Sequence, residues 1–165
     1  TLDRLGAALT PEVHRDFFGY ALRVTPRHFK EAIEILADVI MNPKLDTSSI
    51  EKAKSLLNSE IDREQKDVFY DSENLFLEVI GKGHAYSLPI LGTKESINGI
   101  SEKELKEWVS KHFIPENSIF SIVGAVTTLE IKTALEEYFK NFKRPQLQST
   151  PFLQLPSPEY IKENI

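Results

Sequence analysis

Histidines and one acidic helical segment carry the side chains that metal or acid–base chemistry would need in this sequence. The histidines are His14, His28, His84 and His112. No two of them are four residues apart, the spacing at which two side chains on one helix face hold one metal ion. The histidines therefore do not predict a complete zinc site within this chain. His112 lies near the end of a predicted helix, where a histidine interacts favourably with the negative end of the helix dipole. His84 is expected in a solvated loop.

Three carboxylates, Glu60, Asp62 and Glu64, lie close together on a predicted long helix. On spacing alone, the simpler interpretation is a solvated acidic face. The functional interpretation is that Glu60 supplies one carboxylate ligand to a hard or borderline cation. Neither interpretation yields a self-contained active site.

Length and composition limit the classes of protein to consider. The chain has 165 residues, of which 41% are hydrophobic and 27% charged, so it can build a core. It contains no Cys, which excludes disulfide scaffolds, Cys-ligated zinc, iron–sulfur clusters and thiol catalysis. A net charge of −5 argues against general nucleic-acid binding. No apolar run approaches the roughly 20 residues of a membrane span. The compartment stays open between cytoplasm, periplasm and an organellar matrix.

Apolar periodicity in the first half predicts one strand and three helices. Alternating aromatic and aliphatic residues over 17–24 predict a strand. Thr25 and Pro26 then begin a helix that ends at Asn42-Pro43. A second helix starts near Thr47 or Ser48, where Ser48 and Glu51 form a predicted capping box, and a third ends at Gly81-Lys82-Gly83.

The second helix carries Glu60. Its predicted core stripe consists of Ile50, Ala53, Leu57 and Ile61. Because Glu60 is offset by about 100° from Ile61, we expect it to face a cleft or the module edge.

The second half predicts an irregular loop over 84–93, then a helix with a capping box at Ser101 and Glu104. Residues 119–126 carry no charge and predict a buried strand. A final helix is predicted from Thr127 or Thr128 through Phe142. Few strands among many helices give an α+β class, and because two strands alone are marginal in water, the native sheet is expected to use strands outside this chain.

The composition changes after Arg144. Four prolines fall within 14 residues, at Pro145, Pro151, Pro156 and Pro158. We therefore expect residues 1–144 to form one partial module and residues 145–165 a Pro-rich linker or arm toward a following module. The nearly uncharged strand over 17–24 predicts self-association through its edge or exchange of the tail between copies. The alternative is that Ala7–Thr10 covers this edge and the chain is a monomer.

Several segments together resemble the pitrilysin/insulinase-type zinc peptidases, which include the mitochondrial processing peptidase. The segments that carry the resemblance are residues 33–43 (IEILADVIMNP), 50–61 in the next helix, the loop 84–93 (HAYSLPILGT), and 113–117 (FIPEN) followed by 122–126 (IVGAV). Their order and spacing are more specific than any one segment, and they span about Leu2 to Phe142. The resemblance implies an α+β module with an antiparallel sheet covered by helices on one face.

The resemblance also implies a zinc site shared with residues outside this chain. In that family an H-x-x-E-H motif and a later Glu hold zinc, and the Glu of the motif is the general base. The implied third ligand here is Glu60, and the motif is expected upstream of Thr1, so this chain alone is not expected to hold zinc. The implied activity is hydrolysis of internal peptide bonds, with an extended peptide substrate added at a sheet edge.

Two positions depart from the pattern of active members. Ala53 stands where they carry a second Glu, and Thr10-Pro11-Glu12-Val13 stands where they carry an Asn-Ala-x-Thr-like strand. Both departures resemble the non-catalytic subunits and halves of the family, which line the peptide-binding chamber and pair with an active partner. The implied partners are a peptide substrate and a second metallopeptidase-like module or subunit, with a homo-oligomer as a further alternative and neither nucleic acid nor membrane.

Overall fold

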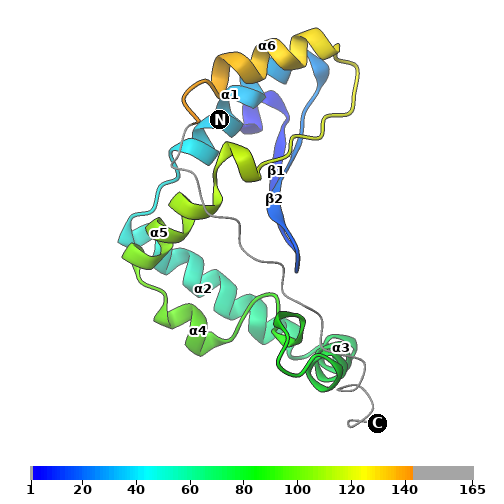
Figure 1. Ribbon diagram of the computed structural model, residues 1–165, viewed down its shortest axis with the longest axis vertical. Coiled ribbons are helices and arrows are strands. Elements are labelled where there is room, and N and C mark those ends of the chain that lie inside the picture. The colour runs from blue at the N-terminus through cyan, green and yellow to red at the C-terminus, as the bar shows by residue number, and fades with distance from the viewer. Residues whose placement is uncertain (1, 143–165) are drawn as a thin grey trace. The chain divides into compact units, whose positions relative to one another are not determined.

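A computed structural model describes residues 2–142 of the chain (Figure 1). The chain divides into two compact units. Within the described residues, unit 1 comprises 2–45 and 103–142, and unit 2 comprises 46–102. The predicted linker or arm over 145–165 lies outside the described residues. No helix in the described part combines the length and the apolar character that crossing a bilayer requires.

Unit 1 contains one hairpin and its covering helices. Its elements are η1 (Leu2–Leu5), β1 (Ala8–Val13), β2 (Phe18–Arg23), η2 (Pro26–His28), α1 (Phe29–Met41), most of α5 (Glu102–His112), η4 (Pro115–Asn117) and α6 (Thr128–Tyr138). The strand predicted over 17–24 is thus confirmed as β2. The predicted helix from Pro26 starts as a single 3-10 turn, and Thr25 makes no side-chain capping bond.

The hairpin pairs β1 with β2 in antiparallel register, from Ala8 opposite Arg23 to Val13 opposite Phe18. Apolar periodicity had not indicated β1 as a strand, and only the family resemblance placed one at Thr10-Pro11-Glu12-Val13. A proline is accommodated where its position needs no ladder donor, as on an edge strand. This pairing covers one edge of β2, close to where Ala7–Thr10 had been considered.

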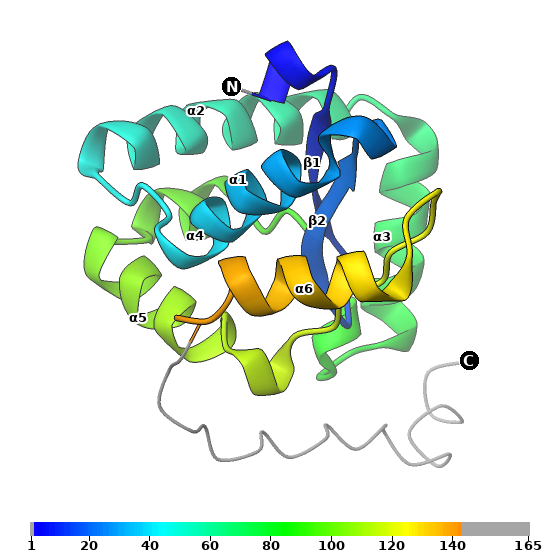
Figure 2. The same cartoon turned by 90° about the horizontal axis from the view of Figure 1, so that it is seen from above.

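Helices α1 and α6 lie side by side over one face of the hairpin (Figure 2). The core consists of Phe29, Ile33 and Leu36 from α1 with Ala134 from α6, and Leu9 and Leu22 of the hairpin pack against it. Ala134 has no exposed surface, and its small side chain permits close approach of the two helices. The α+β class, with an antiparallel sheet covered by helices on one face, is confirmed.

The prediction of a buried strand over 119–126 is wrong for the structure described here. The segment forms no strand and bends at Gly124 and Ala125, and Ile119 and Val123 are 95% and 98% exposed. Ile122 and Val126 pack against the core, and Phe120 meets Phe139 with ring centroids 4.8 Å apart. The period-two pattern is therefore real, but a strand also needs a hydrogen-bonded neighbour.

Local signals at the ends of α6 are partly confirmed. The Thr127 hydroxyl accepts the N–H of Glu130 at 3.2 Å, and the Glu130 carboxylate accepts the Thr127 N–H at 2.8 Å, which completes a capping box. The helix ends at Tyr138 instead of continuing through Phe142. Phe142 is nevertheless buried.

Unit 2 is helical. Its elements are α2 (Thr47–Glu64), α3 (Val68–Ile80), η3 (Ala85–Ser87) and α4 (Lys94–Gly99). As predicted, α3 is followed by Gly81, whose N–H donates to the Leu77 carbonyl at 2.8 Å. The capping box predicted for α2 is wrong, because Asp46 is the N-cap and its carboxylate accepts the Ser49 N–H at 2.8 Å.

Candidate functional site

Glu60, the predicted metal ligand, lies in the last turns of α2. The helix buries Ile50 and Ile61, as expected, but Ala53 and Leu57 are exposed. The partly buried positions between the two isoleucines are Lys54, Asn58 and Glu60, of which Lys54 and Asn58 share the face of Ile50 and Ile61. The inward stripe is therefore rotated by one residue from the predicted one, and the predicted core position of Ala53 and Leu57 is wrong.

Polar contacts with α4 explain this rotation. The Lys54 ammonium donates to the Asn98 carbonyl at 3.3 Å, and the Asn58 amide donates to the Asn98 side-chain oxygen at 3.0 Å. Lys94, which begins α4, forms an ion pair with Asp62. We call Lys54, Asn58 and Asn98 the polar interlock. An apolar-periodicity argument missed it because amide and ammonium side chains carry no burial signal of their own.

Glu60 lies on the helix face that this packing leaves uncovered. Positions 53, 57 and 60 recur at three- and four-residue steps, so Ala53, Leu57 and the partly exposed Glu60 share that face. The Glu60 side chain is 38% exposed and pairs with Arg63, whose own side chain is 76% exposed. A carboxylate whose ion-pair partner is so exposed remains accessible to a competing cation.

Glu64, one turn further, has one carboxylate oxygen that is buried and has no hydrogen-bond partner. The Oδ1 atom of Asn58 is in the same state. Unpaired buried oxygens are uncommon and costly. Glu64 had been considered only as a member of an acidic face, and the sequence offered no signal that its oxygen would be buried.

The histidines make local contacts and do not converge. His84 accepts the Tyr86 N–H at 3.2 Å and thereby caps a 3-10 turn, so it is a structural residue of the loop. His112 and Trp108 have ring centroids 4.6 Å apart, and His14 stacks on Phe17 at 4.3 Å. His28 pairs with Glu31 at 2.6 Å.

The donor set within the described residues does not fit zinc by itself. No three His, Cys, Asp or Glu side chains in residues 2–142 are grouped so that they could hold a metal ion. A zinc site needs three protein ligands when catalytic and four when structural. Glu60 supplies one carboxylate, so any zinc at this position needs ligands from polypeptide beyond the described residues.

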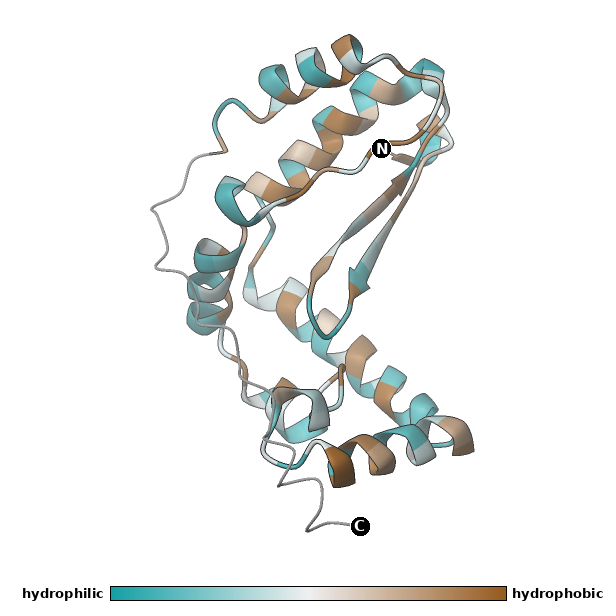
Figure 3. Ribbon diagram, turned by 45° about the vertical axis from the view of Figure 1, so that its right-hand side comes forward, coloured by the Kyte–Doolittle hydropathy of each residue, from teal (hydrophilic) through white to brown (hydrophobic). Residues whose placement is uncertain are grey.

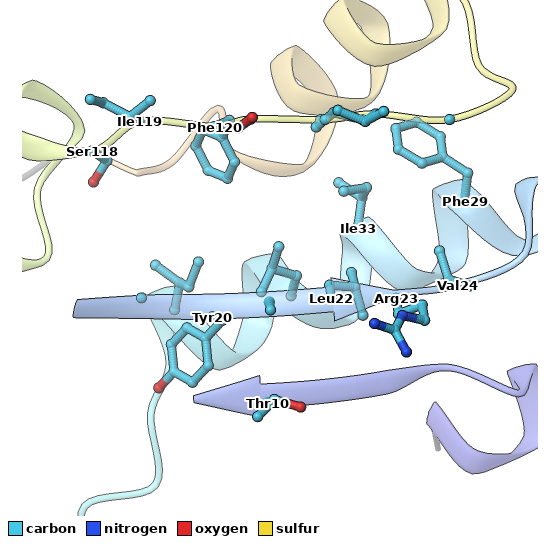
Figure 4. A pocket seen from close by; sticks show the side chains of 18 of the residues that line it. Thr10, Tyr20, Leu22, Arg23, Val24, Phe29, Ile33, Ser118, Ile119 and Phe120 are labelled. Atoms are coloured by element: carbon cyan, nitrogen blue, oxygen red, sulfur yellow. The ribbon is translucent and has the colours of Figure 1, made fainter. Parts of the chain in front are cut away.

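Unit 1 contains a large cavity of about 1060 Å³, which the sequence had not indicated. One wall is β2 and the opposite wall is the segment 118–126, while Phe29 and Ile33 of α1 project between them (Figure 4). The unpaired strand-like pattern of 119–126 was the only available sequence signal for it. The lining is largely apolar and brings together no acid–base pair.

Three shifted pKa values lie outside both regions. Hydrogen bonds from the Thr127 N–H and hydroxyl lower the pKa of Glu130. Hydrogen bonds from its own backbone N–H and from Thr93 lower the pKa of Glu95, and desolvation raises the pKa of Tyr138. Each shift follows from a helix cap or from packing, and none marks a catalytic group.

Comparisons with known proteins place these features in a family. The chain is 26% identical over 149 residues to the mitochondrial-processing peptidase subunit beta of Dictyostelium discoideum, covering 88% of this chain and 31% of that protein. It is 31% identical over 160 residues to cytochrome b-c1 complex subunit 1 of Caenorhabditis elegans, covering 92% and 33%. It is 23% identical over 146 residues to the zinc protease YmxG of Bacillus subtilis, covering 87% and 35%.

The chain thus spans about a third of the length of these relatives. Its fold matches the crystal structure of a protease from Helicobacter pylori with a TM-score of 0.84 at 17% identity, covering 94% of this chain and 38% of that one. Two family models match the sequence: "Insulinase (Peptidase family M16)" over residues 1–94 and "Peptidase M16 inactive domain" over residues 99–164. Since the first alone matches more than half of the chain, and the α+β fold agrees, this chain belongs to the insulinase family of peptidases, M16.

Proposed function

We propose that this chain is part of a zinc endopeptidase that hydrolyses internal peptide bonds, and that Glu60 is its third zinc ligand. The position of Glu60 carries the proposal. Its carboxylate lies on the uncovered face of α2, half exposed, within the 1–94 region that matches the insulinase model. A relative with the printed name of zinc protease is consistent with a zinc-dependent activity.

Within this chain, the role of Glu60 would be to present one negatively charged oxygen to the metal. Bound zinc would supply Lewis-acid activation of water. The Arg63 guanidinium, now paired with Glu60, would have to release it or share it.

The second candidate function is a non-catalytic subunit that lines a peptide-binding chamber and pairs with an active partner. Ala53, on the same helix face as Glu60, favours it, because the family resemblance implies a second Glu at that position. The similarity to a cytochrome b-c1 complex subunit and to the family's inactive domain also favours it. The coding sequence upstream of Thr1 discriminates the two: an intact H-x-x-E-H supports the enzyme and a degenerate motif supports the subunit.

The experiment compares the natural protein that contains this chain with its Glu60→Gln variant, with Glu64→Gln as the matched control. We expect chelator-sensitive cleavage of a quenched fluorescent peptide and bound zinc in the wild type and in Glu64→Gln. Glu60→Gln should lose both. Retention of zinc and activity by Glu60→Gln would rule out the ligand assignment, and an inactive, zinc-free wild type would favour the non-catalytic subunit.

The 165-residue chain by itself should cleave no peptide, with or without added zinc. It offers at most one of the three ligands and the general base that zinc hydrolysis needs. Incubation with zinc and the same fluorescent peptide tests this expectation. Turnover that a chelator abolishes would contradict it.

A further inference from the structure

We propose that Asn98 is a site of spontaneous covalent modification, at which its side-chain amide is converted to a carboxyl group. The attacking group is the backbone nitrogen of the next residue, Gly99, at the end of α4. The site lies wholly within unit 2 and is independent of zinc and of Glu60. Its product places a new negative charge in the polar interlock between α2 and α4.

The residue that follows Asn98 sets it apart from the other asparagines. Asn98 is the one asparagine in the 165-residue sequence that precedes a glycine. The others precede Pro43, Ser59, Leu75, Ser118, Phe142 and Ile165. A side chain on the following residue crowds its backbone nitrogen, and a proline nitrogen carries no proton at all. Glycine lacks a Cβ atom, so the Gly99 nitrogen is the least hindered nucleophile beside any asparagine of this chain.

The fold gives no reason of its own for a glycine at position 99. The φ angle of Gly99 is not in the left-handed region, unlike those of Gly83 and Gly92. A Cβ atom added to Gly99 would meet no other atom within 4 Å. Gly99 and Asn98 are both exposed, so water and hydroxide reach them. An alanine would therefore fit here, and Gly99→Ala is a variant that hinders the nucleophile while it preserves the packing.

The reaction balances with water as the only co-reactant. The Gly99 nitrogen, after it loses its proton to hydroxide, attacks the side-chain carbonyl carbon of Asn98. A new C–N bond forms, the bond to the amide nitrogen breaks, and that nitrogen leaves as ammonia. Water then opens the resulting cyclic succinimide at either of its carbonyl groups. The products are aspartate and isoaspartate, in which the backbone continues through the former side chain.

Two contacts of Asn98 favour this reaction. The Asn58 amide donates to the Asn98 side-chain oxygen at 3.0 Å, and negative charge develops on this oxygen during the attack. A donor at that position stabilises the charge and makes the carbonyl carbon more electrophilic. The Lys54 ammonium, 3.3 Å from the backbone carbonyl oxygen of Asn98, adds a positive charge beside the site. The polar interlock therefore assists the attack.

The position of Gly99 at a helix end supplies the freedom that the attack requires. In a regular helix the backbone nitrogen faces the carbonyls of the preceding turn, so the last turn has to open first. α4 has only six residues, and the following residue, Ile100, donates its N–H to the Ile97 carbonyl. Helix ends open at a low cost in free energy. By contrast, Asn58 and Asn74 lie within the longer helices α2 and α3.

The two products should affect the polar interlock differently. Aspartate keeps the oxygen that accepts the Asn58 amide and adds attraction to the Lys54 ammonium, so the contact between α2 and α4 is retained. Isoaspartate lengthens the backbone and displaces the carbonyl oxygen that Lys54 contacts. Conversion to isoaspartate should therefore raise the hydrogen exchange of the α4 amides, whereas Asn98→Asp should leave it nearly unchanged.

The test incubates the natural protein that contains this chain at mildly alkaline pH, beside its Gly99→Ala and Asn58→Leu variants. Digestion with pepsin in acid, where the reaction is slow, precedes tandem mass spectrometry. We expect the peptide with residue 98 to gain a carboxyl group and to contain isoaspartate, while peptides with the other asparagines stay unchanged.

The variants separate the roles of the nucleophile and of the polar interlock. Gly99→Ala should react at least about tenfold more slowly, which corresponds to a barrier higher by about 1.4 kcal/mol. Asn58→Leu should also react more slowly, by about tenfold or more, because the side-chain oxygen of Asn98 loses its donor. The same comparison in urea measures the effect of Gly99→Ala on the chemistry without the helix.

Results of four kinds would overturn the proposal. An Asn98 that stays unmodified in the folded protein would do so, and conversion in urea would then show that α4 protects it. Aspartate without isoaspartate would indicate direct hydrolysis by water. Equal rates for the wild type and Gly99→Ala would exclude the Gly99 nitrogen as the nucleophile. A faster reaction in Asn58→Leu would show that the polar interlock restrains Asn98 and does not assist the attack.

Discussion

The two units differ in what holds their helices together. In unit 1, α1 and α6 pack through an apolar core in which Ile33 and Ala134 are almost fully buried. In unit 2, the polar interlock joins α2 to α4, and the buried residues are Ile50 and Ile61 of α2 and Ile97 of α4. The contact between α1 and α6 is therefore part of an apolar core, whereas hydrogen bonds between polar side chains contribute to the contact between α2 and α4.

Both units also leave large apolar side chains uncovered, in unit 1 for example Phe17, Ile119 and Val123. Unit 2 exposes large apolar side chains on α2 and α3, where Figure 3 shows brown turns: Leu56, Leu57, Val68, Phe69, Leu75, Phe76, Val79 and Ile80. Apolar patches of this kind mark interaction surfaces. Glu60, on the uncovered face of α2, therefore lies in the same unit as this apolar surface. The comparison predicts unequal effects of matched substitutions in the two units.

The largest effect is expected in the core of unit 1. Ile33→Ala should lower the free energy of unfolding by about 3 kcal/mol, because it removes buried methyl groups and leaves a cavity. Leu56→Ala on α2, where the side chain is 73% exposed, should change it by less than about 0.5 kcal/mol. Urea unfolding followed by circular dichroism measures both. Equal losses would show that α2 is buried to the same extent as α1.

The next effect concerns two capping boxes, one in each unit. Thr127→Ala should destabilise unit 1 by about 1 kcal/mol, because the N–H of Glu130 loses its acceptor. Thr93→Ala is the matched change in unit 2, where Thr93 and Ser96 form the box. Hydrogen exchange of the amides in α6 and α4 reports each cap separately. A change in α4 on substitution of Thr127 would contradict two independent caps.

The cap of unit 1 should also depend on pH. Hydrogen bonds with Thr127 lower the pKa of Glu130 in the folded state. The stabilisation of the fold by this carboxylate is therefore fully present above its ordinary pKa of 4.5. The contribution is lost as the pH falls from there through the lower folded-state pKa. Glu130→Gln should therefore flatten the decline in stability below pH 4.5. Near neutral pH, the dependence of stability on pH should change little. An unchanged acid profile would show that the carboxylate does not stabilise the cap.

Substitutions in the polar interlock should lower the stability of unit 2 by as much as the loss of a helix cap, or by less. Asn98→Ala removes the acceptor for the Asn58 amide and should cost about 1 kcal/mol in unit 2. Asn58→Leu should cost less than Asn98→Ala, since it also removes the buried, unpaired Oδ1 of Asn58. Thermal unfolding of both variants decides this. A larger loss for Asn58→Leu would mean that the unpaired oxygen has a partner in solution.

The smallest effect on stability is expected at Glu60. Its ion pair with Arg63 is solvent-exposed, so Glu60→Gln should change the free energy of unfolding by less than about 0.5 kcal/mol. The same urea experiment measures it, with Arg63→Gln as the matched change. A loss well above this would make Glu60 a structural residue and weaken its assignment as a ligand.

Local patterns in the sequence predicted much of the secondary structure. Three features could be predicted because each depends on residues within a few positions of one another. They are the alternation over β2, the Thr127–Glu130 capping box and the helix end at Gly81. The order of several short segments also indicated the family, which the match to the insulinase model confirms. The single candidate ligand, Glu60, was identified from that resemblance and stays a prediction.

Tertiary structure decided which of these patterns found a partner. Residues 119–126 have the alternation of a strand, yet they make no backbone–backbone hydrogen bond among residues 2–142. The buried face of α2 turned toward Lys54 and Asn58 because Asn98, forty residues from Asn58, offers hydrogen bonds that no local pattern encodes. Whether a segment forms a helix depends largely on residues within one turn of one another. Burial and strand pairing depend on contacts between distant segments, which only the folded chain or its partner brings together.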